Sequence, residues 1–177
     1  RSSVALAGKT LTAGKLLHVQ AGKNLSLANA NVHGSAISAS AGGNVSNGGV
    51  AGTISDVAGI TIKAKGKVVL GGETLYVTNG AMTLSAAGGS LALAGVTLTA
   101  GAGKTTMTAG GDIVMTGATV NLANLSQDAG GNIDLTSATA AITGNMSLTA
   151  GKDIVVSRAN LTAGRSEEHT SELQSRH

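Results

Sequence analysis

Apolar and polar residues alternate in short segments along most of this chain, and a glycine-containing turn separates one group of segments from the next. Alternation with a period of two is typical of β-strands that bury one face. No segment carries apolar residues at the 3.6-residue period of an amphipathic helix, so the pattern predicts an all-β fold. The apolar pairs that carry the pattern are Leu17/Val19, Leu25/Leu27, Ile60/Ile62, Val68/Leu70, Leu75/Val77, Met82/Leu84, Leu91/Leu93, Ile113/Met115, Val120/Leu122, Ile133/Leu135, Met146/Leu148 and Ile154/Val156.

The turns form a regular internal repeat of the type Ala-Gly-Gly-Asn/Asp-Ile. Their second position recurs at 22, 42, 65, 88, 110, 130 and 151, which gives spacings of 20 to 23 residues. Three short strands and three turns in about 21 residues make one coil of a parallel β-solenoid, so the chain is expected to hold roughly seven coils. The seven turns are Ala21–Leu25, Ala41–Val45, Ala64–Val68, Ala87–Leu91, Ala109–Ile113, Ala129–Ile133 and Ala150–Ile154.

A single coil of this kind buries too little apolar surface to fold alone, so the coils are expected to stack and to pair their backbones. The absence of Pro agrees, because each strand has to donate hydrogen bonds to its neighbours. An Asn or Asp after the glycines can bond to nearby backbone. If the coils stack in register, these side chains form a ladder along one edge: Asn24, Asn44, Asp112, Asn132 and Asp153.

Composition narrows the class of protein. The chain has 27 Gly, no Cys and one aromatic residue, Tyr76, so its core must consist of aliphatic side chains and Met. The absence of Cys excludes a disulfide framework and thiolate metal sites, and no apolar run approaches the ~18 residues of a membrane helix. The net charge is only +3, and Lys and Arg are scattered without stacking aromatic residues, so we expect no nucleic-acid partner.

The repeated turn, as in Ala109-Gly110-Gly111-Asp112-Ile113 and Ala129-Gly130-Gly131-Asn132-Ile133, resembles the filamentous haemagglutinin and adhesin repeats of two-partner-secretion exoproteins. Contact-dependent growth-inhibition toxins carry similar repeats in their stalks. The resemblance covers about residues 5–164. It implies a right-handed parallel β-helix, exported through an outer-membrane transporter to the bacterial cell surface or the medium.

By this resemblance, residues 1–164 are a piece of a longer exoprotein whose other parts contact a host or a neighbouring cell. Its expected function is that of a structural shaft without catalysis, and we predict no catalytic, cofactor-binding or metal-binding residue. Because coils are open to pairing at both ends, the isolated chain is also expected to associate end to end.

Residues 165–177 break the repeat. They hold five charged residues and no Gly, and residues 165–175 resemble the translation of a sequencing-library adapter. We therefore interpret 165–177 as a non-native tail, outside the fold. The start at Arg1-Ser2-Ser3, without Met, agrees with a fragment of a longer protein.

Two other functions were weighed. A carbohydrate-active β-helix enzyme would need converging acidic and basic groups and sugar-stacking aromatics. The acidic residues recur near turns instead: Asp56, Glu73, Asp112, Asp128, Asp134 and Asp153. An ice-binding solenoid would need Thr-x-Thr pairs in one row on successive coils, and the pairs at Thr10/Thr12, Thr97/Thr99 and Thr106/Thr108 skip coils.

Several local patterns have simpler explanations. Ala100–Thr105 resembles the end of a phosphate-binding loop but lacks its first Gly, so a repeat turn is expected. His18 and His33 have no carboxylate nearby in the sequence and are expected to face solvent. Glycosylation sequons occur at Asn24, Asn44, Asn124, Asn145 and Asn160, and most follow from a turn Asn placed before a strand.

Overall fold

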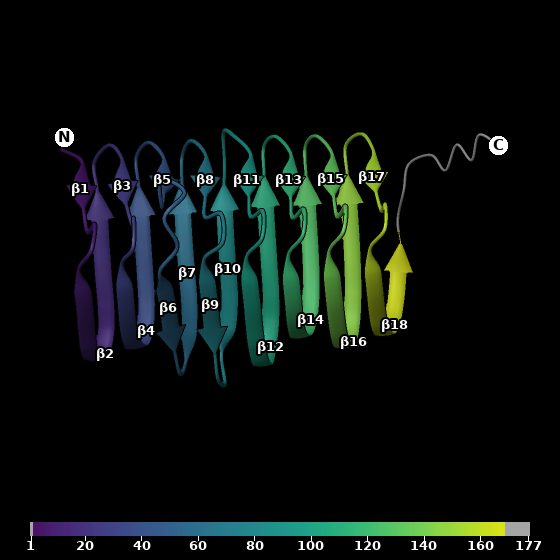
Figure 1. The fold of residues 1–177 in the computed structure, drawn as a ribbon, viewed down its shortest axis with the longest axis horizontal. Helices are drawn as coiled ribbons and strands as arrows, with labels where there is room; N and C mark the ends of the chain where they lie inside the picture. The colour runs from purple at the N-terminus through teal and green to yellow at the C-terminus, as the bar shows by residue number, and fades with distance from the viewer. Residues whose placement is uncertain (1, 169–177) are drawn as a thin grey trace.

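A computed structural model of the chain describes residues 2–168, with side chains through residue 164. Its described part is an all-β solenoid of eight coils stacked side by side, so that the two ends of the chain lie at opposite ends of the stack (Figure 1). The described residues contain no helix, and hence none with the length and hydropathy needed to span a bilayer. The parallel solenoid predicted from the repeat is confirmed, with eight coils where roughly seven were expected.

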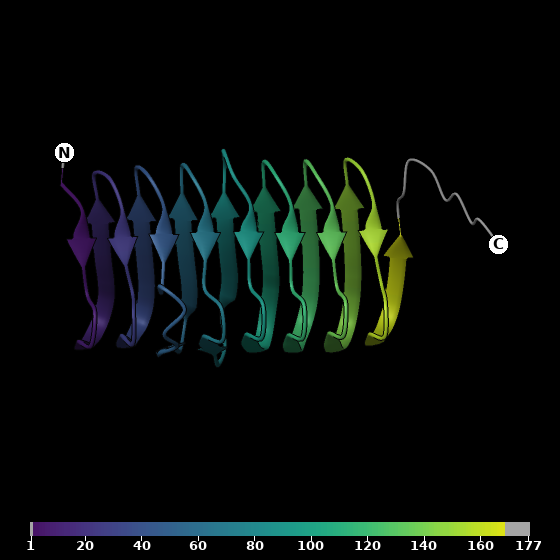
Figure 2. The same cartoon turned by 45° about the horizontal axis from the view of Figure 1, so that its top comes forward.

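Each coil begins with a two-residue strand, and the eight short strands form one parallel sheet along the stack (Figure 2). They begin 20 to 23 residues apart, as the turn spacing predicted. The register is strict, since Leu25 pairs with Val45 and Val45 with Val68. The short strands are β1 (Val4–Ala5), β3 (Leu25–Ser26), β5 (Val45–Ser46), β8 (Val68–Val69), β11 (Leu91–Ala92), β13 (Ile113–Val114), β15 (Ile133–Asp134) and β17 (Ile154–Val155).

The other two faces of the coil differ from the prediction of three separate strands. In six coils one long strand runs across both faces, and its register shifts near the corner, for example between Ala13 and Leu16. The backbone bends there without losing its pairing. The six long strands are β2 (Thr10–Ala21), β4 (Asn31–Ala41), β12 (Thr97–Ala109), β14 (Thr119–Ala129), β16 (Thr139–Ala150) and β18 (Asn160–Glu168).

Coils 3 and 4 depart from this plan. In each, the long strand is divided in two, and the connecting loops extend below the stack (Figure 1). Coil 3 contains β6 (Thr53–Asp56) and β7 (Gly59–Ala64), and coil 4 contains β9 (Thr74–Val77) and β10 (Ala81–Ala86). These two coils therefore form an irregular section within an otherwise uniform stack.

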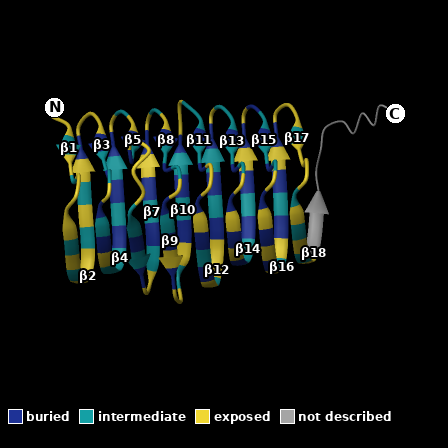
Figure 3. Cartoon of the chain, viewed as in Figure 1, coloured by how far each residue is buried: buried dark blue, intermediate teal, exposed yellow. Residues whose placement is uncertain are grey.

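The core is a continuous column of aliphatic residues, and buried and exposed positions alternate along the strands (Figure 3). Most predicted pairs are buried, including Ile60/Ile62 and Met82/Leu84, which are all fully buried. Leu17/Val19 in coil 1 are only partly buried. The expectation for Ile154/Val156 was wrong: Val156 is 50% exposed, because no further coil covers β17 among the described residues.

The predicted alignment of one turn was also wrong by a residue. Ala86, and not Ala87, pairs with Ala64 on one side and Ala109 on the other. The turn between β10 and β11 is therefore one residue longer than its neighbours. Of the predicted tail at 165–177, the backbone of 165–168 continues β18, and residues 169–177 lie outside the described residues.

Candidate functional site

The Asn/Asp ladder predicted from the turns is present. The side-chain oxygen of each turn residue accepts the backbone N–H of its equivalent in the next coil. The bonds run from Asn44 N to Asn24 Oδ1 (2.9 Å), from Lys67 N to Asn44 Oδ1 (2.8 Å), from Asp112 N to Ser90 Oγ (3.2 Å), from Asn132 N to Asp112 Oδ1 (2.7 Å) and from Asp153 N to Asn132 Oδ1 (3.1 Å). Lys67 interrupts the series, because its side chain has no acceptor.

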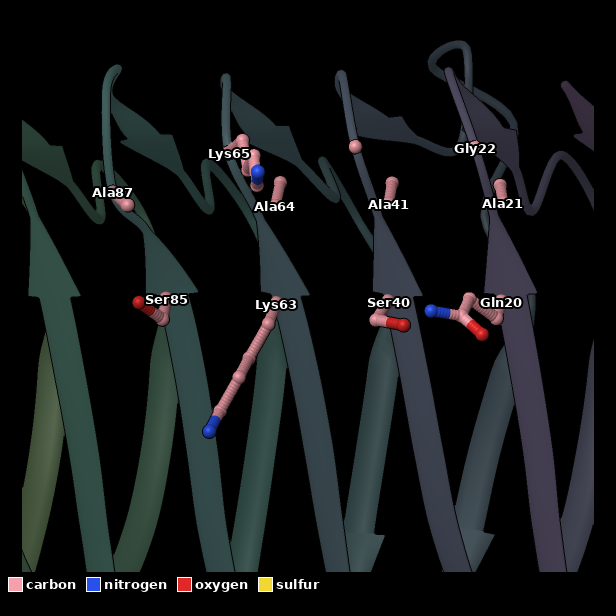
Figure 4. Close-up of a pocket in the computed structure, with 11 residues that line it drawn as sticks. Gln20, Ala21, Gly22, Ser40, Ala41, Lys63, Ala64, Lys65, Ser85 and Ala87 are labelled. Carbon is pink, nitrogen blue, oxygen red and sulfur yellow. The ribbon is translucent and has the colours of Figure 1, made fainter. Parts of the chain in front are cut away.

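A shallow groove runs beside this ladder across the first four coils. It has a volume of about 530 Å³ and lies where the long strands end (Figure 4). Gln20, Ser40, Lys63 and Ser85 form one side as a row of outward-facing residues, and small residues such as Ala41 form the other (Figure 4). The groove is therefore polar and cationic, without a carboxylate in its lining.

Hydroxyl groups cover the face below this groove. One outward column consists of Ser or Thr in six successive coils, and Thr108 Oγ1 donates to Ser85 Oγ in the adjacent column (2.9 Å). The adjacent column is interrupted by Lys63 and Asp128. The six are Ser38, Thr61, Thr83, Thr106, Ser126 and Ser147. Thr106/Thr108 thus lie on a different face from Thr10/Thr12 and Thr97/Thr99, which sit at matching positions in coils 1 and 5.

Charge is distributed unevenly along the stack. Residues 2–104 contain seven Lys, all exposed, whereas their two carboxylates, Asp56 and Glu73, are buried. Residues 105–164 contain four Asp, one Lys and one Arg. The surface of coils 1–5 is therefore cationic up to Lys104, and carboxylates are exposed only beyond it.

Buried polar groups gather in the irregular section. Asn47 and Glu73 replace apolar residues in the core, and Asn47 Nδ2 donates to Glu73 Oε2 (2.9 Å) and to Gly71 O (2.7 Å). Gly52 N also donates to Glu73 Oε2 (3.1 Å), while Glu73 Oε1 has no partner. Burial raises the pKa of Glu73, and the bonds from Asn47 and Gly52 offset only part of that effect.

A second hollow lies on the outward side of the same section. His33, Ser55 and Tyr76 occupy one register position in coils 2, 3 and 4. Together with Val57 and Thr78 they surround a space of about 190 Å³. His33 Nδ1 and Ser55 Oγ are hydrogen-bonded, and Tyr76 is 45% exposed. Sequence reasoning treated Tyr76 as isolated, since only the stacking brings these three residues together.

The remaining predicted features occupy ordinary structural positions. Ala100–Thr105 forms the bend within β12, so the phosphate-loop resemblance has no helix behind it. His18 and His33 are exposed as expected. Among the described residues no group of three or more His, Cys, Asp or Glu side chains could hold a metal ion. Asn132 lies between Asp112 and Asp153 in the ladder, as the sequence indicated.

A profile of the hemagglutinin repeat family matches residues 2–48 and 79–141. The chain belongs to the hemagglutinin repeat family. Comparison with curated proteins and with solved structures gives no match. The hemagglutinin repeat match covers regular coils on both sides and leaves out residues 49–78, which include most of the irregular section.

Proposed function

We propose that this chain is a length of structural shaft from a large secreted bacterial exoprotein of the adhesin type, exported by the two-partner route and without catalytic activity. The observation that carries the proposal is the unbroken pairing of both sheets through all eight coils of a hemagglutinin-repeat chain. Such repeats as a family belong to secreted surface adhesins. Contacts between neighbouring coils alone hold the stack together, so length can change without loss of the fold.

The exposed carboxylates support a non-catalytic role. Asp112 and Asp153 each serve the turn ladder and are separated by Asn132, while Asp134 Oδ1 accepts the backbone N–H of Thr136 (2.9 Å). These acidic side chains are thus engaged by local backbone, and none faces another across a cleft. A polymer contact would have to use the extended surface instead.

Whole-coil deletion tests the shaft. Removing residues 113–132 joins Asp112 to Ile133, which holds the same register position as Ile113. We expect a folded rod shorter by ~4.8 Å in small-angle X-ray scattering, with its β circular dichroism retained. The matched control removes residues 113–122, half a coil, and is expected to lose cooperative unfolding. Equal disruption by both deletions would contradict a modular shaft.

Export is tested separately. The chain, fused behind a two-partner secretion domain, is expected in the medium only when the matching outer-membrane transporter is expressed. The secretion domain alone serves as the control for transporter function. Retention of the fusion in cells that export the control would argue against the two-partner route and leave the fold unaffected.

A further inference from the structure

The outward column formed by His33, Ser55 and Tyr76 has the geometry of a slot. Successive coils rise by about 4.8 Å, so the two ring-bearing residues stand roughly 10 Å apart along the column, with the small Ser55 between them. Thr12 and Thr99 continue the column on either side. A small residue between two rings leaves room for one planar group of similar size.

The walls and floor of this slot are chemically distinct. Tyr76 and His33 supply the rings, the exposed Val57 (51% exposed) adds an aliphatic surface, and Ser55 and Thr78 bring hydroxyl groups. Together they enclose about 190 Å³, with no Lys or Arg in the lining. The slot thus combines an aromatic face with hydrogen-bonding edges and lacks a counter-ion for an anion.

Asp56 fixes the loop that forms one wall. Its side chain is buried (4% exposed), and Oδ1 accepts the backbone N–H groups of Ala58 (2.6 Å) and Gly59 (3.0 Å). Oδ2 has no hydrogen-bond partner in the structure. A buried carboxylate oxygen without a partner at the base of the slot is costly unless a donor reaches it, and a hydroxyl group of a ligand is such a donor.

We propose that the slot between His33 and Tyr76 binds a neutral pyranose residue of a surface glycan. One face of a pyranose is lined with C–H groups that pack on the Tyr76 ring, and its equatorial hydroxyls reach Ser55, Thr78 and the His33 imidazole. The absence of cations in the lining favours neutral sugars over sialylated or sulfated ones, which the exposed lysines elsewhere in coils 1–5 would attract. The slot lies where the hemagglutinin repeat match is interrupted, in residues 49–78 for all but His33 and Gly34.

This site goes beyond the shaft function and does not depend on the export route. A regular shaft presents the same polar surface on every coil, whereas coils 2–4 present the single aromatic ring of the chain. The shaft would then carry its own contact point for a glycan in addition to contacts made elsewhere in the parent protein.

Tyr76 provides a built-in probe, because the chain has no Trp and no other Tyr. Titration of the full chain with galactose, glucose, mannose and N-acetylglucosamine is expected to change the tyrosine fluorescence saturably for at least one sugar, with a millimolar Kd. N-acetylneuraminic acid and heparin serve as anionic probes and are expected to leave the emission unchanged at moderate salt.

Two variants locate the site. Ser55→Val fills the slot but keeps the probe, and it is expected to weaken binding at least tenfold, whereas Asn121→Ala, two coils further along the same column, leaves binding unchanged. Tyr76→Ala is expected to abolish sugar saturation-transfer signals in NMR and Tyr76→Phe to retain them, with folding checked by circular dichroism. A flat titration with every neutral sugar, equal binding by Ser55→Val, or a response to the anionic probes alone would each overturn the proposal.

Discussion

Asn24 Oδ1 accepts a hydrogen bond from the backbone N–H of Asn44 at 2.9 Å, and the two residues hold the same turn position in successive coils. Each side chain therefore satisfies the backbone of the next coil, and the ladder couples neighbouring coils along one edge of the solenoid. The chain breaks this series once, at Lys67.

Lys67→Asn is expected to restore the ladder and stabilise the protein by about 0.5–1 kcal/mol, since the new amide oxygen would accept the backbone N–H of Ser90. The Lys67 Cγ already lies near Gly89, where a ladder side chain lies in other coils. Urea denaturation followed by circular dichroism measures the change. Lys65→Asn, an exposed change two positions earlier, should stay within about 0.5 kcal/mol. A gain of equal size in both variants would point to charge removal instead of the ladder.

The glycines of the turn make room for this ladder. A Cβ on Gly131 would lie 2.1 Å from Asp112 Oδ1, the atom that accepts the N–H of Asn132. Gly131→Ala is therefore expected to cost about 1–2 kcal/mol, because the Asp112 side chain must move. The cost stays moderate since Lys152 fills the equivalent position of the next coil, where the ladder bond is 3.1 Å.

Gly14→Ala is the matched control for this change, as a Cβ on Gly14 would meet no atom within 4 Å. Its midpoint of urea denaturation should match that of the unmodified chain. If the two alanine variants lost the same stability, backbone flexibility and not the close approach would explain the glycines.

Sequence reasoning recovered the features that repeat. Stacking requires every coil to present the same residue type at the same position, so the turn at Ala129–Ile133 and the pair Ile60/Ile62 carried the fold, the register and the ladder. The fusion of two faces into one long strand was missed, because a bend with continuous pairing leaves no Gly or Pro signal in a chain already rich in Gly.

Features that occur once were not predictable. Glu73 and Asn47 read as turn residues in the sequence but lie in the core, where each supplies the other with a partner one coil away. His33, Ser55 and Tyr76 are 21 to 22 residues apart, and their shared column depends on loop lengths in coils 3 and 4 that differ from the average repeat. Only the structure fixes those lengths.

Glu73 and Asp134 should give opposite pH dependence. Because the pKa of Glu73 is raised above its usual 4.5, the folded state holds this proton more tightly, and its contribution to stability falls as pH rises from about 4.5 through the raised pKa. Glu73→Gln is therefore expected to be more stable than the unmodified chain at neutral pH, with the difference vanishing toward pH 4. Urea denaturation across this pH range measures it.

The comparison with Asp134 supplies the sign control. Hydrogen bonds from the Thr136 side chain and backbone lower the pKa of Asp134 from its usual 3.8. Its stabilising contribution is thus present above that value and lost as pH falls through the lowered pKa. Asp134→Asn should destabilise at neutral pH and converge with the unmodified chain in acid. Parallel curves for both variants would contradict the burial of Glu73 as the cause.

The chain in isolation is expected to associate end to end. The strand β2 pairs with β4 on one side only, and the apolar residues of coil 1 are partly exposed, among them Leu11, Leu17 and Val19. An unpaired edge with apolar side chains is a template for a second chain. Sedimentation velocity should show oligomers that grow with concentration, and Leu17→Lys with Val19→Lys should reduce them, because inward-facing charge blocks the stacking of another coil. The surface variant His18→Lys in the same strand adds charge without changing the inward face and should associate like the unmodified chain, so loss of oligomers in that variant would indicate general repulsion. Monomers of the unmodified chain at high micromolar concentration would show that coil 1 does not act as a template.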